Sequence, residues 1–173
     1  MQDHPKPPRY QPEATLPTYA FVPGRNPHPT RHPDGHSYGP EPPLPTLLPA
    51  ANWIDCPEYL RGADLYNLGY FWEAHEAWEG LWVVAEGHDQ AQRLYLQGMI
   101  QLSAAMLKLH MSQPRGFVKL TASGAALIER SRLVTPSEPY MGLRRRLHLS
   151  AIASYAASAP SSPEEAPLLW LSE

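Results

Sequence analysis

The spacing of apolar residues divides the chain into an irregular first third and a helical remainder. Residues 57–69, 70–87, 89–112 and 114–133 each repeat apolar side chains three or four positions apart, the spacing of one face of an α-helix. A weaker pattern of the same kind covers residues 144–158. No segment shows the strict alternation of a half-buried strand. The pattern therefore predicts an all-α fold, a bundle of two antiparallel helical hairpins plus a weaker C-terminal helix.

Proline marks the boundaries of this helical region. Fifteen of the 21 prolines lie within residues 1–57, and none lies between Glu58 and Gln113. Because each proline removes a backbone donor and disfavours helix at the residue before it, the first part is predicted to be an extended arm. Asp55 and Asp89 are predicted to cap helix starts, and Gly69 and Gly87 to end helices. We therefore expect an arm over 1–52, a helical core over 53–136, and a C-terminal helix and extended tail over 137–173.

The arm contains apolar residues that a free tail would not need. They predict that it docks on the body, and they are Tyr10, Tyr19, Phe21, Val22 and Tyr38. The tail carries a second expected docking strip, formed by Leu168, Leu169 and Trp170.

The segment FWEAHEAWEGLW, residues 71–82, places polar side chains on an apolar helix face. On a helical wheel of 100° per residue, His75 and Glu79 fall on the stripe that carries Phe71, Trp78 and Trp82, with Glu76 at its edge. Glu73 falls on the opposite side. The third predicted helix also has a polar stripe, which includes Gln97 and Gln101. Since buried polar groups need partners, we expect the two stripes to face each other across the hairpin.

Two explanations of this cluster remain open. The first is a satisfied polar network that fixes the register of the helices. The second is a functional site, in which His75 and Glu79 ligate a divalent metal or Glu79 acts as a base oriented by His75. HEAWE is not the zinc-protease pattern HExxH, since its fifth position is Glu79, and a third metal ligand is not placed by the sequence.

The arm has a histidine cluster of its own. His28, His32 and His36 are four residues apart, but the prolines between them exclude a helix. Histidines in such a loop are usually ordinary loop residues, so they are only a weak metal signal.

Composition excludes several classes of protein. With 173 residues and a net charge of −3, the chain has no global basic field for nucleic acid. Its only basic run, LRRRLH at residues 143–148, is predicted to be a solvated helix face. The single cysteine, Cys56, is expected to be a buried thiol in a reducing compartment. Neither a signal peptide nor an apolar run long enough to span a membrane is found, so a cytoplasmic location is expected.

Three motifs together resemble a known family. They are LYNLGYFWEAHEAWEGLW, LYLQGMIQLSAAMLKLH and RGFVKL, within residues 58–134, and they resemble Domain of Unknown Function 309. The matching positions are His75, Glu76, Glu79, Trp82, Gln97, Gly98, Gln101, His110 and Gly116. Trp78 departs from the family, which more often has an aliphatic residue there. The resemblance implies a small helical bundle and no activity.

Two functional hypotheses follow. The first is a non-enzymatic binding module that recognises a protein partner or a small ligand and is compatible with a homo-oligomer. The polar cluster of this module would be His75, Glu76, Glu79, Trp82, Gln97 and Gln101. The alternative is a metal-dependent or acid–base enzyme, hydrolase-like, centred on His75 and Glu79. In that case the cofactor would be a divalent metal.

Overall fold

The computed structural model describes residues 6–172 and contains six helical segments. Their bounds are η1 Ala50–Asp55, α1 Pro57–Asn67, α2 Phe71–Val84, α3 Gln90–His110, α4 Pro114–Val134 and α5 Arg145–Ala157. Over these residues there is no β-strand, only the isolated bridges Tyr140–Leu143 and Leu143–Leu171. The prediction of an all-α fold is confirmed.

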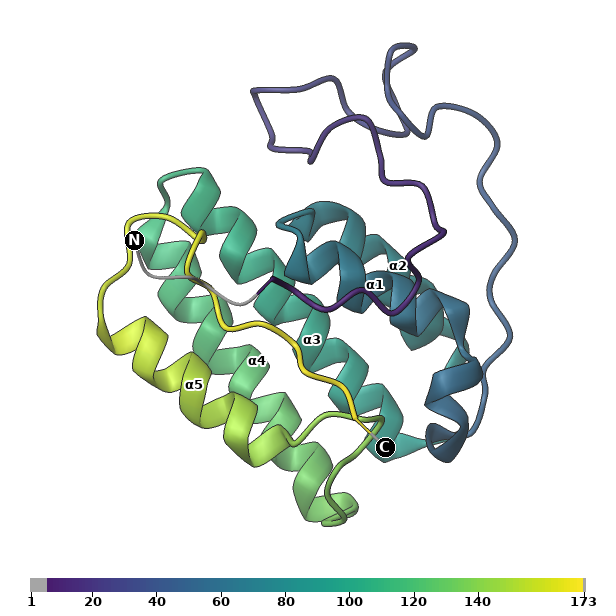
Figure 1. Cartoon of the computed structure of the whole chain (residues 1–173), viewed down its shortest axis with the longest axis vertical. Helices are drawn as coiled ribbons and strands as arrows, with labels where there is room; N and C mark the ends of the chain where they lie inside the picture. Colours follow the sequence, from purple (N-terminus) through teal and green to yellow (C-terminus); the bar gives the residue numbers. More distant parts are fainter. Residues whose placement is uncertain (1–5, 173) are drawn as a thin grey trace.

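The helices pack in chain order. The hairpins α1–α2 and α3–α4 lie against each other through α2 and α3, and α5 covers α4 (Figure 1). The C-terminal tail crosses the helices beside the first part of the arm (Figure 1). None of the helices within residues 6–172 has both the length and the apolar character needed to cross a bilayer.

Two predicted caps have different outcomes. Asp89 caps α3 as expected, since its Oδ1 accepts a hydrogen bond from Gln92 N at 2.9 Å. Asp55 does not cap α1, because it ends the 3₁₀ helix η1, and the N-cap residue is Cys56. The bond from Cys56 N to Trp53 O at 3.1 Å closes that 3₁₀ turn, so α1 starts one residue later. Cys56 itself is buried, as predicted.

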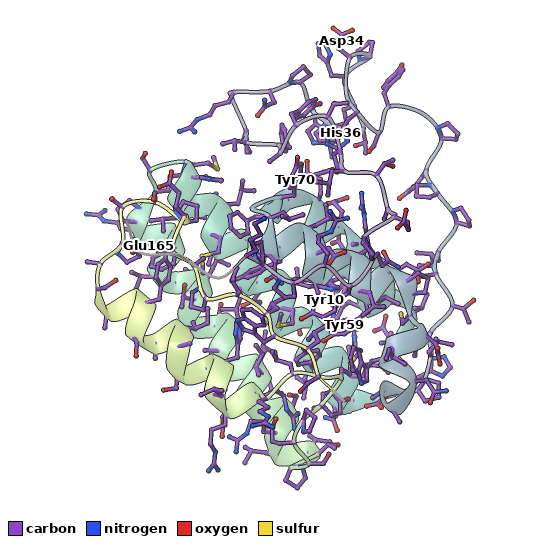
Figure 2. All side chains as sticks on the ribbon, in the orientation of Figure 1. Tyr10, Asp34, His36, Tyr59, Tyr70 and Glu165 are labelled. Atoms are coloured by element: carbon purple, nitrogen blue, oxygen red, sulfur yellow. The ribbon has the colours of Figure 1, made fainter. Side chains whose placement is uncertain are left out.

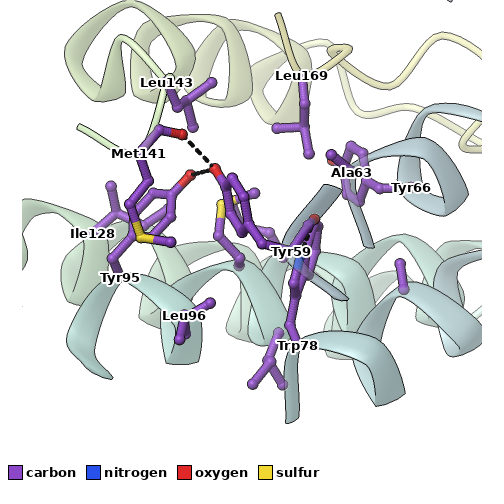
Figure 3. Packing of buried hydrophobic residues seen from close by; sticks show 14 of the residues in the cluster. Tyr59, Ala63, Tyr66, Trp78, Tyr95, Leu96, Ile128, Met141, Leu143 and Leu169 are labelled. Carbon is purple, nitrogen blue, oxygen red and sulfur yellow. Dashed lines mark hydrogen bonds between the residues drawn. The ribbon is translucent and has the colours of Figure 1, made fainter. Parts of the chain in front are cut away.

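Aromatic residues join the hairpins in the core. The Tyr59 hydroxyl lies 2.8 Å from the Tyr95 hydroxyl and donates to Met141 O at 2.8 Å, which links α1, α3 and the loop before α5 (Figure 3). Trp78 of α2 is fully buried, and its Nε1 donates to Tyr59 O at 3.2 Å. Leu169 of the tail also belongs to this core. One core therefore includes residues from α1 to the tail.

Glycine permits two close approaches that the packing requires. A Cβ at Gly62 of α1 would lie 2.1 Å from Trp78 Nε1, so the indole occupies the space of the missing side chain. A Cβ at Gly98 of α3 would lie 2.6 Å from Ile128 Cγ1 and 2.9 Å from Gly124 O. Larger residues at either position would separate the helices.

The start of the arm is fastened to α1 by a buried carboxylate. Asp64 accepts hydrogen bonds from Tyr10 N at 2.6 Å, Gln11 N at 2.8 Å and Arg9 Nε at 3.3 Å. The Tyr10 hydroxyl in turn bonds the tail, donating to Leu169 O at 3.0 Å. Because the donors surround Asp64, its burial leaves no charge without a partner.

The expected anchors of the arm differ in burial. Phe21 and Val22 are buried, and Tyr10 and Tyr19 are half-buried. Tyr38 was expected to dock but is 58% exposed, because it follows the turn that returns His36 to the body.

Two predictions for the C-terminal part need correction. LRRRLH is not a uniformly solvated face, since Arg145 and His148 are buried. Arg145 is drawn inward because its guanidinium bonds Glu138 and Ser131. In the tail, Leu169 docks as expected, whereas Trp170 is 53% exposed.

Candidate functional site

The buried face of helix α2 differs from the predicted one. Its buried apolar residues are Phe71, Ala74, Trp78 and Leu81. α2 packs against both α1 and α3, which centres the buried stripe between Ala74 and Trp78. His75 and Glu79 therefore lie beside that stripe, and both are half-buried. The expectation that they are enclosed by the bundle is wrong.

Three side chains gather on this open part of α2. Ligating atoms of His75, Glu76 and Glu79 all lie within 4.8 Å of one another, and within residues 6–172 no other group of three such side chains is found. His75 Nδ1 is 3.3 Å from Glu76 Oε1, and their side chains are 27% and 42% exposed. Sequence reasoning placed Glu76 only at the edge of the cluster. The spacing i, i+1, i+4 could have identified it, because all three positions fall within one 100° sector of a helix.

Contacts between α2 and α3 set the register of the hairpin. Arg93 NH2 lies 3.3 Å from Glu86 Oε1, and its Cζ lies 4.9 Å from the centre of the Trp82 ring. At the other end, Ser103 Oγ donates to Phe71 O at 2.8 Å. These contacts show that α2 and α3 run antiparallel, and none of them involves His75, Glu79, Gln97 or Gln101.

The polar residues of α2 and α3 do not form the predicted hydrogen-bonded network. Among the hydrogen bonds of residues 6–172, none joins His75 or Glu79 to Gln97 or Gln101. Gln101 Oε1 accepts instead from Ser123 Oγ of α4. A half-exposed carboxylate or imidazole is solvated by water, so it has no need of such a partner.

Trp82 is also less enclosed than predicted. It is half-buried and packs against the edge of the core, whereas Trp78 is fully buried. Its indole Nε1 is buried and has no hydrogen-bond partner in the described part of the chain.

The opposite side of α2 carries a carboxylate that the helical wheel placed away from the apolar stripe. The Glu73 side chain is 5% exposed, because the arm covers it. Its Oε1 accepts from Phe21 N at 2.9 Å and lies 2.8 Å from His36 Nε2. Figure 2 shows Asp34 at the outer end of the arm and His36 nearer the helices. The wheel could not reveal this burial, since the covering segment lies far away in sequence.

The three arm histidines have different surroundings. His36 pairs with Glu73, while the His28 ring packs 5.2 Å from Phe21 and 5.6 Å from Trp72, centre to centre. His32 is exposed, with its Nδ1 3.8 Å from Asp34 Oδ2. Within residues 6–172 these histidines do not form a group of ligands with one another.

Four cavities lie away from the cluster on α2. They are a 510 Å³ cavity beside His110, a 370 Å³ groove beside His148, a 520 Å³ cavity beside Trp53 and a 750 Å³ cleft beside Arg144. Burial, with a smaller effect of Arg25, lowers the pKa of His110. None of these four cavities, which described residues line, includes His75, Glu76 or Glu79. The exposures of 27% for His75 and 42% for Glu76 place the cluster at the surface.

Comparison with known proteins finds a family match in the helical part of the chain. The family model described as Domain of unknown function (DUF309) matches residues 59–120, from α1 into α4, so this region is similar to that family. No curated protein and no solved structure matched the chain. The family carries no assigned activity, so function is argued from the site.

Proposed function

We propose that this protein is a binding module that holds a divalent transition-metal ion on the open side of α2. The observation that carries the proposal is the approach of His75, Glu76 and Glu79, whose ligating atoms lie within 4.8 Å of one another. All three positions also belong to the family motif. Because they do not serve the core, a role in binding explains their side-chain chemistry better than a role in packing.

The donor set favours zinc and similar ions. One imidazole nitrogen and two carboxylate oxygens suit a metal of intermediate softness, and bonds of about 2.0–2.2 Å are usual. Two ligands on opposite sides of such an ion are at most ~4.2 Å apart, so the side chains must rotate slightly to close on it. Their exposures of 27% for His75 and 42% for Glu76 leave room for this rotation.

Three protein ligands leave coordination positions that face solvent. A carboxylate, imidazole or other donor from a second molecule can complete the shell, which makes the ion a point of attachment for a partner or small ligand. The hydrolase-like alternative uses the same ion to activate water. It normally needs an enclosed pocket for substrate, and the four cavities described above lie elsewhere.

The test is a metal titration of protein purified without a tag. Zinc binding is followed by calorimetry, and cobalt binding by visible absorption. We expect His75→Ala and Glu79→Gln each to weaken binding at least about tenfold, since second-shell changes alone give ~10–100-fold losses. The matched controls are His32→Ala in the arm and Glu86→Gln beyond the cluster, and both should bind as the wild type does.

Two results would reject the proposal. One is wild-type zinc affinity in His75→Ala together with a loss of zinc binding in variants of His28, His32 or His36. This result would place the metal site in the arm. The other is no binding at millimolar zinc. If the zinc form instead hydrolyses p-nitrophenyl esters, and Glu79→Gln abolishes this turnover, the enzyme alternative replaces the binding module.

A further inference from the structure

A basic cleft lies at the corner between the end of α4 and the start of α5. Its volume is about 750 Å³, and its lining includes Arg132, Arg144, Arg146, Ser150, Glu138 and Leu147. We propose that this cleft binds the phosphate group of a small phosphorylated organic molecule. This site goes beyond the metal site on α2 and shares no residue with it.

The middle arginine of the run 144–146 makes the corner rigid. Arg145 is fully buried, and its Nε donates to Glu138 Oε1 at 3.2 Å and its NH1 to Ser131 Oγ at 3.0 Å. Its NH2 donates to the carbonyls of Thr135 and Ser137. Arg145 thus ties the loop between α4 and α5 to both helices, and its donors are used inside the protein.

The two neighbours of Arg145 have the opposite environment. Arg144 and Arg146 are exposed, and within residues 6–172 neither lies within 4.0 Å of a carboxylate oxygen. Both line the cleft, and Ser150, one turn of α5 after Arg146, also lines it and adds a hydroxyl donor. Since arginine binds phosphate oxygens in a bidentate manner, this pair offers a ready set of donors.

The acidic residue of the cleft is already neutralised. Glu138 Oε2 accepts from Arg145 N at 2.8 Å, and its Oε1 lies 3.3 Å from Arg132 Nε. Arg132 also pairs with Glu129. Four arginines, at positions 132, 144, 145 and 146, and two glutamates, at positions 129 and 138, sum to +2 (4 − 2) in a chain of net charge −3. The N-terminal end of α5 adds a favourable dipole for an anion.

Apolar surface beside the arginines favours an organic phosphate. Leu147 is 67% exposed, and Pro136 and Pro139 also line the cleft. A base or another flat group can lie on these side chains while the arginines hold the phosphate. The volume is in the usual range for small-molecule sites, about 300–1,000 Å³.

The experiment uses the full chain in EDTA, so that metal binding on α2 plays no part. Adenosine 5′-monophosphate, inorganic phosphate and adenosine are titrated and followed by NMR shifts of backbone and arginine side-chain NH groups. We expect the monophosphate to bind more tightly than phosphate, and adenosine not to bind. The double variant Arg144→Gln, Arg146→Gln should bind the monophosphate at least about tenfold more weakly, because two charge-assisted donors are lost. Leu147→Ala should lower the affinity for the monophosphate and leave the affinity for inorganic phosphate unchanged.

The control is the double variant Arg31→Gln, Arg115→Gln. Both arginines are exposed and lie outside the cleft, so this variant changes the net charge by the same amount. This variant should bind as the wild type does. Equal losses in the two double variants would overturn the proposal, because they would show attraction by overall charge. Binding of adenosine as tight as that of its monophosphate, or no binding at 10 mM, would also overturn it. A single-stranded oligonucleotide that binds far more tightly than the mononucleotide, and depends on Arg144 and Arg146, would replace the small ligand by a nucleic acid.

Discussion

The two sides of α2 carry the same kind of residue with different consequences. On the covered side, Glu73 lies beneath the arm and is bonded to Phe21 and His36. The arm passes this side again at Gly80, where a Cβ would lie 3.2 Å from Pro45 Cδ. On the open side, Glu76 and Glu79 contact no segment of the arm through a hydrogen bond within residues 6–172. What distinguishes a structural carboxylate from an available one is therefore the segment that covers it.

The largest expected effect compares two tryptophans of α2. Trp78→Ala should lower the free energy of unfolding by about 3–5 kcal/mol, because the ring is fully buried against Gly62. Trp82→Ala should lower it by less than about 2 kcal/mol, because part of its ring is already exposed to water. Urea unfolding followed by circular dichroism measures both. Equal losses would mean that the open side reaches into the core.

A second prediction extends the comparison to histidines, because His148 is enclosed whereas His75 is open. Burial lowers the pKa of His148 from 6.5 to about 4, so the folded state favours the neutral ring. The folded protein therefore binds fewer protons than the unfolded chain between these values. The contribution of His148 to the free energy of unfolding is fully present above pH 6.5. It is lost as the pH drops towards 4, and the loss reaches up to about 3 kcal/mol.

The measurement is the free energy of unfolding at pH 7, 5.5 and 4.5 for the wild type and for His148→Leu. The loss on acidification should be smaller in the variant, because both proteins share all other titrating groups. The prediction fails if His148→Leu and the wild type lose stability in parallel.

The third prediction concerns the covered carboxylate. Glu73→Ala should lower the free energy of unfolding by about 1–3 kcal/mol, since it leaves Phe21 N and His36 Nε2 beneath the arm without their acceptor. It should also free residues 19–36 for proteolysis while the helical circular dichroism is kept. Glu79→Ala is the matched control and should leave the arm protected. Unchanged protease resistance in Glu73→Ala would show that other contacts hold this part of the arm.

The sequence predicts more of the fold than of the site. Apolar spacing, prolines and the Asp89 cap locate the helices, because these signals act over a few residues. The burial of Glu73 and Asp64 could not be read in this way, since it depends on residues 9–36 of an irregular arm. Arg145 is similar, because only the folded loop brings Glu138 and Ser131 to it. The approach of His75, Glu76 and Glu79 is local to one helix, and its spacing was visible from the start.

The smallest expected effect is on the open side of α2. A buried His75 would make His75→Ala costly, by about 1–3 kcal/mol, because it would leave Glu79 without a partner. With both side chains half-exposed, the change should instead stay within about 0.5 kcal/mol, as is usual for surface substitutions. The contact of His75 with Glu76 adds little, since exposed ion pairs contribute about 0–1 kcal/mol. Urea midpoints of His75→Ala, Glu79→Gln and Glu73→Ala, measured without metal, make the comparison.

Addition of zinc should then raise the midpoint of the wild type and of Glu73→Ala but not that of His75→Ala, because only an ion bound to the folded state stabilises it. A loss in His75→Ala as large as that in Glu73→Ala would mean that the open side is structural after all.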